Sequence, residues 1–167
     1  MQQAHALAWI YRNSSSLGLN KNKIVVSGHS AGGHLSAMLL AAKWPTAASD
    51  LPVDLVKGAI TLSGLFDLRP VSKAPFLAKD VRLNESEAIA LSPVFMPPAT
   101  NAPLLTAVGE LESEAFHDQT SEIEKAWKLS FQARMPALAA NHFSICDRFA
   151  TPNDPLFEQS LELLKAI

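Results

Sequence analysis

The stretch VVSGHSAGGHL, residues 25–35, decides the fold. Two β-branched residues run into a turn of small residues, and Ser30 lies in that turn between two histidines. Residues 28–32 fit G-x-S-x-G, a pattern in which a strand turns sharply into a helix and exposes the middle serine. Because glycine has no Cβ, we expect the outer glycines to let the flanking backbone approach closely. The pattern predicts a nucleophile elbow built from Ser30 and its neighbours Gly28, His29, Ala31 and Gly32.

Length, charge and cysteine content narrow the class of protein. A chain of 167 residues with 48% hydrophobic content suits one domain, residues 1–167. The net charge of -2, without a cluster of basic residues, argues against nucleic acid as a partner. With Cys146 as its single cysteine and no metal-ligand spacing, the sequence predicts no disulfide, no metal and no cofactor. Without a signal peptide or a long apolar run, we expect a soluble, cytoplasmic protein with no membrane partner.

Strand and helix patterns alternate along the chain. Apolar runs with glycine near their exits predict strands at 23–27, 56–62 and 104–108, and a short fourth strand at 135–138. Helical spacing predicts helices at 1–12, 31–43, 85–90, 122–131 and 156–166. This alternation predicts an α/β fold, a mostly parallel sheet with helices on both faces. The long, proline-rich connection 65–103 is either a cap or lid over a binding site or a plain structural excursion.

A nucleophilic serine needs a histidine to take its proton and a carboxylate to orient that histidine. Where the elbow occurs, the chain order is serine, acid, histidine, each after the carboxyl end of a strand. Glu112 follows the third predicted strand and His142 the fourth, so they have the required order.

Other residues compete for these two roles. Among the histidines, only His142 follows a late strand. His5 lies on the first predicted helix, His29 and His34 lie in or just beyond the elbow, and His117 lies in a polar stretch of helical character. For the acid, Glu112 leads, and spacing alone leaves open Asp67, Glu110 and Glu114. Cys146 is not on an elbow and is a weak candidate for the nucleophile.

Five segments in order resemble one known group: GHSAGGHLSAMLL, SGLFDLRPV, LNESEAIALSPVF, VGELESEAF and NHFSI. Together they resemble the α/β-hydrolase esterases of the kynurenine formamidase (arylformamidase) type over nearly the whole chain. The resemblance implies Ser30 as nucleophile, His142 as base and Glu112 at the position where relatives usually carry aspartate. It also implies that the chain corresponds to the C-terminal portion of a larger fold, a partial α/β-hydrolase.

The resemblance also implies features that the printed sequence does not carry. Relatives have further strands and an HGG-type motif before the helix with which this sequence begins, and that motif supplies part of the oxyanion hole. Here the backbone N–H of Ala31 supplies one donor, and lacking a second typically lowers the rate by about 100-fold to 1000-fold. The strand 23–27 would lie at a sheet edge, so we expect a homo-oligomer or a partner chain that pairs with it.

Two classes of function follow. The first is a serine hydrolase that cleaves small carboxylic esters (a carboxylesterase) or, alternatively, the aryl formamide N-formylkynurenine. The second is a catalytically impaired fragment or an interaction module that retains the elbow. Ester and formamide hydrolysis use the same triad, so the triad residues do not choose between them.

Overall fold

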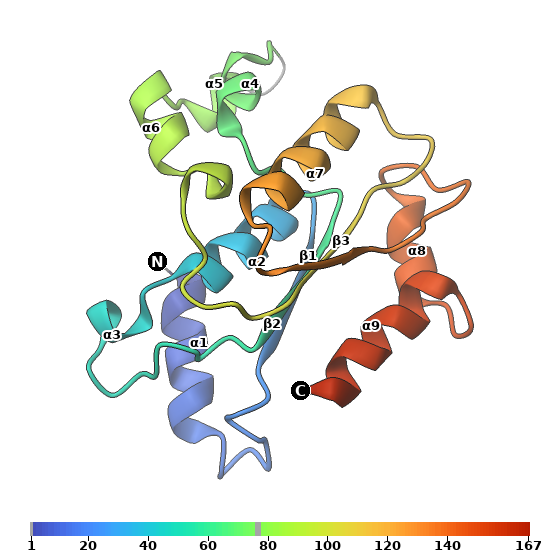
Figure 1. Cartoon of the computed structure of the whole chain (residues 1–167). Coiled ribbons are helices and arrows are strands. Elements are labelled where there is room, and N and C mark those ends of the chain that lie inside the picture. The colour runs from blue at the N-terminus through green and yellow to red at the C-terminus, as the bar shows by residue number, and fades with distance from the viewer. Residues whose placement is uncertain (1, 76–77) are drawn as a thin grey trace.

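The computed structural model describes residues 2–75 and 78–167 and contains a four-stranded parallel sheet (Figure 1). Its strands follow one another in the spatial order β1-β2-β3-β4. Their bounds are β1 (Val25–His29), β2 (Gly58–Leu62), β3 (Leu104–Ala107) and β4 (Phe131–Arg134). Since all neighbours are parallel, the carboxyl ends of the strands meet at one edge of the sheet.

Helices connect the strands and cover both faces of the sheet (Figure 1). One face carries α1 (Gln2–Asn13), α2 (Ala31–Ala41) and α7 (Glu114–Ala126). The other carries α8 (Ser144–Ala150) and α9 (Pro155–Ala166). Shorter helical segments lie in the connections: α3 (Trp44–Ala47), α4 (Leu68–Lys73), α5 (Ala78–Val81), α6 (Glu85–Ala90) and the 3-10 turn η1 (Pro93–Phe95). The expected α/β class, with a mostly parallel sheet covered on both faces, is confirmed.

The two central strands explain the two hydrophobic cores. All residues of β2 and β3 are buried, as expected for parallel strands covered on both faces. Ala59 faces a core shared with α1, α2 and α7, whereas Ile60 faces a core shared with α8 and α9. Alternate residues of one strand therefore pack against opposite layers of helices.

The structure confirms several predicted elements with small shifts of their ends. These are the first helix, the last helix, the short helix 85–90 and the two central strands. The fourth strand was predicted wrongly at 135–138, because β4 is Phe131–Arg134. That strand alternates partly buried with exposed residues, and the apolar Met135 and Ala137 lie beyond it, in the core under α9. The prediction followed the buried apolar residues at 135–138 and so placed the strand four residues too late.

The last long helix before β4 also differs from its prediction, which placed it at 122–131. Helix α7 is Glu114–Ala126, so it starts eight residues earlier. Its first turns bury polar side chains, Gln119 and Thr120, which apolar periodicity does not detect. The helix predicted at 31–43 ends at Ala41, and Trp44 starts the short α3.

Within the described residues, β1 lies at one end of the sheet and pairs only with β2. Four of its five residues are at least partly exposed and Val26 is buried, whereas all residues of β2 are buried. No helix in the part of the chain that the structure describes is long and apolar enough to cross a membrane.

Candidate active site

The elbow lies between β1 and α2. Ser30 has a φ of 55° and a ψ of −118°, an unusual backbone conformation for a residue with a side chain. Its N–H donates to the carbonyl oxygen of Leu62 at 2.9 Å, which ties the bend to the end of β2. Such strain is typical of functional sites, where the surrounding structure holds the residue in place.

Two glycines, Gly28 and Gly33, make this bend sterically possible, whereas the sequence pattern predicted Gly28 and Gly32. A Cβ on Gly28 would lie 2.2 Å from the carbonyl oxygen of Gly32, so no side chain fits at Gly28. A Cβ on Gly32 would meet nothing within 4 Å, so the expectation was wrong for Gly32. The second close approach is made by Gly33, whose Cβ would lie 2.8 Å from the Cα of Gly64.

Ser30, His142 and Glu112 lie in one chain of hydrogen bonds. The distance from His142 Nε2 to Ser30 Oγ is 3.1 Å. On the other side of the ring, His142 Nδ1 lies 2.7 Å from Glu112 Oε2. The Glu112 side chain is 1% exposed and that of His142 is 25% exposed. The carboxylate is thus buried behind a histidine that still reaches solvent.

The buried Glu112 carboxylate has further donors. Its Oε1 accepts from the backbone N–H of Gly109 at 2.8 Å and from the hydroxyl of Ser63. Ser63 is fully buried and has a φ of 48°, at the end of β2. Sequence reasoning did not assign a role to Ser63, although its place after a strand was a usable signal. Because burial of an unpaired charge is costly, these donors stabilise Glu112 beside the histidine.

The other candidate carboxylates have different partners. Asp67 accepts hydrogen bonds from the backbone and guanidinium of Arg69 and caps α4. Burial alone would raise the pKa of Asp67, but the hydrogen bonds from Arg69 outweigh it, and the pKa is lowered. Glu110 accepts from the N–H of Ala139, and Glu114 is exposed in the first turn of α7.

Other rings pack against the His142 ring. The centroid of the His29 ring lies 4.5 Å from that of His142, and the Phe116 ring lies at the same distance. Burial, followed by the neighbouring His142, lowers the pKa of His29, which favours its neutral form. The packed rings restrict the orientations that His142 can adopt.

The remaining histidines and the cysteine lie outside this hydrogen-bond chain. His5 lies on α1, His117 on α7, and His34 on α2, where its Nε2 lies 2.8 Å from the carbonyl oxygen of Leu91. Burial raises the pKa of the Cys146 thiol, which disfavours the reactive thiolate.

Ala31 follows Ser30 and is the first residue of α2. The first N–H groups of a helix have no acceptor within the helix, and the positive end of the helix dipole lies there. The position therefore suits the stabilisation of negative charge next to the Ser30 hydroxyl. Among the described residues, no three His, Cys, Asp or Glu side chains are grouped so as to hold a metal ion.

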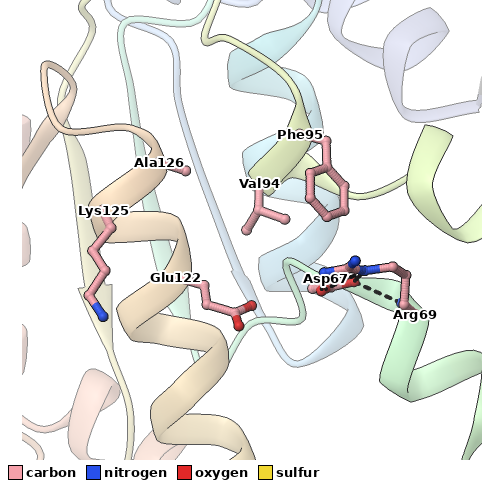
Figure 2. Close-up of a pocket in the computed structure, with 7 residues that line it drawn as sticks. All are labelled: Asp67, Arg69, Val94, Phe95, Glu122, Lys125 and Ala126. Atoms are coloured by element: carbon pink, nitrogen blue, oxygen red, sulfur yellow. Dashed lines mark hydrogen bonds and ion pairs between the residues drawn. The ribbon is translucent and has the colours of Figure 1, made fainter.

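Two hollows near this edge of the sheet differ in chemistry. One, of about 340 Å³, is lined by His142 and Glu112. The other, of about 400 Å³, lies between the loop after β2 and α7, and the Asp67–Arg69 pair lies at its wall (Figure 2). Two of the three hydrogen-bonded residues, His142 and Glu112, line the first hollow and none lines the second, so we place the candidate active site beside the first, where His142 reaches Ser30.

Residues 3–126 match the BD-FAE family. The chain belongs to this family. The kynurenine formamidase of Danio rerio is 28% identical over 151 residues, which are 84% of this chain and 49% of the relative. This BD-FAE chain therefore spans about half the length of that relative.

Solved structures have a similar fold. A candidate thioesterase from Silicibacter sp. tm1040 is 27% identical, with a TM-score of 0.71 over 91% of this chain and 53% of the other. A Pyrobaculum calidifontis esterase shares the fold at 19% identity, with a TM-score of 0.70 over 98% of this chain and 57% of the other. The BD-FAE chain is thus an esterase- and formamidase-like α/β-hydrolase, as its sequence motifs predicted.

Proposed function

We propose that this chain carries the catalytic triad of a serine hydrolase that cleaves small carboxylic esters. The observation that carries the proposal is the continuous hydrogen-bond chain from Ser30 through His142 to the buried Glu112. The esterase and formamidase relatives support the same class of reaction.

In the proposed reaction, Ser30 Oγ attacks the ester carbonyl carbon while His142 Nε2 takes the hydroxyl proton. Glu112 holds the ring through Nδ1 and stabilises its protonated form. The N–H of Ala31 donates to the oxyanion of the tetrahedral intermediate. His142 then gives its proton to the departing alcohol. In the second half of the reaction His142 takes a proton from water, the water attacks the acyl group on Ser30, and the proton returns to Ser30 Oγ as the acid leaves.

Hydrolysis of an aryl formamide is the second candidate reaction. It is favoured by the similarity to the protein named kynurenine formamidase, and it would use the same three residues. Comparison of N-formylkynurenine with short esters as substrates separates the two candidates.

The first test uses a fluorophosphonate, which forms a bond from an activated serine oxygen to phosphorus and releases fluoride. We expect one adduct by intact mass on the native protein and none on heat-unfolded protein or on the Ser30→Ala variant. Hydrolysis of p-nitrophenyl acetate should be lost in the same variant. A native protein that takes up no label would contradict the proposal and favour an interaction module, whose binding Ser30→Ala would leave unchanged.

The position of β1 supports a proposal about assembly. An apolar strand at a sheet edge presents free N–H and C=O groups that another chain can pair with. We infer that a second copy or another polypeptide pairs with this edge strand, which was expected at 23–27 and is found as β1 at Val25–His29. The cap expected at 65–103 stays a prediction, and its residues 76–77 lie outside the described residues. A homogeneous monomer at micromolar concentration with slowly exchanging amides at 24–26 would contradict the strand pairing.

A further inference from the structure

An apolar pocket lies beside the candidate active site. Its volume is about 290 Å³, and it lies between the segment after β2 and the start of α7. Its apolar wall consists of Leu65, Pro70, Val71, Ala74, Ala115 and Phe116. Among the described residues, none that lines it is charged, whereas the hollow in Figure 2 is lined by Asp67, Arg69, Glu122 and Lys125.

The pocket adjoins the hollow that contains His142. Ser113 and Phe116 line both cavities. The Phe116 ring lies 4.5 Å from the His142 ring, centroid to centroid, so one aromatic side chain contacts the proposed base and also forms pocket wall. Ser30 itself lines neither cavity, and the link to the nucleophile runs through His142, whose Nε2 lies 3.1 Å from Ser30 Oγ.

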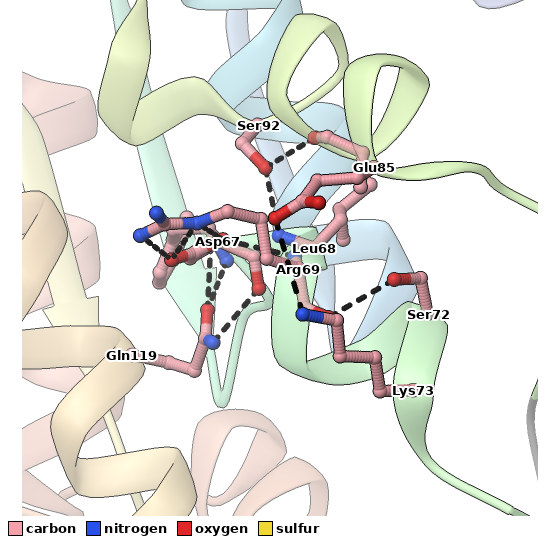
Figure 3. Close-up of polar contacts among 10 residues, drawn as sticks. Asp67, Leu68, Arg69, Ser72, Lys73, Glu85, Ser92 and Gln119 are labelled. Carbon is pink, nitrogen blue, oxygen red and sulfur yellow. Dashed lines mark hydrogen bonds and ion pairs between the residues drawn. The ribbon is translucent and has the colours of Figure 1, made fainter.

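Two polar side chains, Ser113 and Gln119, line the pocket, and Gln119 is already engaged. Gln119 Oε1 accepts from the backbone N–H groups of Phe66 and Asp67, at 2.6 and 2.7 Å. Its Nε2 donates to the carbonyl oxygen of Asp67 at 2.9 Å (Figure 3). Because these contacts hold the amide to the loop after β2, Gln119 shapes the pocket and offers little hydrogen bonding to a ligand.

We propose that this pocket binds the apolar arm of the substrate, an aryl or medium-length aliphatic group, and so sets the substrate class. This inference rests on the proposed hydrolase function and adds a specificity to it. An apolar cavity of about 150 Å³ holds a benzene molecule. A pocket of about 290 Å³ therefore has room for a phenyl group with a short linker or for a chain of several carbons.

The arm can belong to either side of the scissile bond, and two ester series distinguish the sides. In the first, p-nitrophenyl esters of acetate, hexanoate and phenylacetate vary the acyl group. In the second, ethyl, hexyl and benzyl acetates vary the alcohol. We expect kcat/KM to rise by about tenfold or more with the apolar arm in one series, since burial of a few methylenes has an effect of this size.

A variant that fills the pocket tests the assignment directly. Val71 lies in α4 and lines the pocket, so Val71→Trp should remove the preference for the apolar arm. The readout is the ratio of kcat/KM for the ester with the apolar arm to kcat/KM for the acetate, measured in both proteins, so that a general loss of activity in Val71→Trp is not counted as a loss of preference. The matched control is Lys73→Trp, on the same short helix at a side chain that is 70% exposed and not part of the pocket.

The outcomes separate this inference from the function on which it rests. If Val71→Trp keeps the preference while acetate is still hydrolysed, or if neither series shows a preference, the pocket assignment is wrong. If Lys73→Trp abolishes the preference equally, the effect is not that of the pocket and the assignment is also wrong. Failure of the unmodified protein to hydrolyse acetate or to take up the label would instead overturn the hydrolase proposal.

Discussion

We expect the hydroxyl of Ser63 to position the Glu112 carboxylate and thereby to raise the rate of the proposed reaction. Ser63 donates to Glu112 Oε1 from a fully buried position and contacts neither Ser30 nor His142 by a hydrogen bond. Ser63→Ala deletes this donor and leaves the backbone N–H of Gly109 as the remaining donor to the same oxygen. The change therefore loosens the carboxylate without removing its charge.

The magnitude follows from the charge on the acceptor. A hydrogen bond to a charged group contributes about 1.5–3 kcal/mol, and about 1.4 kcal/mol corresponds to a tenfold change in rate. Since the Gly109 and His142 contacts remain, we expect the lower end of this range, roughly a tenfold fall in kcat. KM should change little, because Ser63 lies behind Glu112. The assay is p-nitrophenyl acetate hydrolysis, with the rate of fluorophosphonate labelling as a second readout.

A glycine variant separates the hydroxyl from the backbone. Ser63 has a φ of 48°, a conformation that costs a residue with a Cβ about 1 kcal/mol relative to glycine. Ser63→Gly should lose the same activity as Ser63→Ala but unfold at higher urea concentration, by about 1 kcal/mol in free energy. Full activity in Ser63→Gly, or a rise in KM with unchanged kcat in Ser63→Ala, would refute the positioning role.

Two further predictions concern the elbow and the loop after β2. Gly28→Ala should destabilise the fold by about 3 kcal/mol or more, because its Cβ would lie 2.2 Å from a backbone oxygen. Gly32→Ala should be neutral or should stabilise the fold by up to about 1 kcal/mol, because its Cβ would meet nothing within 4 Å. Equal urea midpoints for the two variants would contradict this steric assignment. Asp67→Asn should destabilise by about 1–2 kcal/mol at pH 7, because it removes the carboxylate that pairs with Arg69. The folded pKa of Asp67 lies below its ordinary 3.8, so this contribution is present above 3.8 and is lost as pH falls through the folded pKa. Denaturation of both proteins at pH 7 and pH 3 checks this, and an unchanged difference at pH 3 would show that the carboxylate charge is not responsible.

The sequence by itself determined the elbow and the class of fold. The bend at Ser30 depends on near neighbours, the β-branched residues before it and Gly28, so its signal is local. The buried strands β2 and β3 were found because apolar runs closed by glycine also depend on adjacent residues. The chain order of serine, acid and histidine then restricted the partners of Ser30 to a few residues.

Only the tertiary structure decided which side chains meet. Glu110, Glu112 and Glu114 lie within five residues of one another, and only the direction of each side chain in the folded loop separates the one beside His142 from the others. Ser63 contacts Glu112 from 49 positions away in the chain. The apolar pocket likewise forms where the segment after β2 meets the start of α7. Local sequence patterns do not encode such contacts, because they arise when parallel strands bring their carboxyl ends to one edge of the sheet.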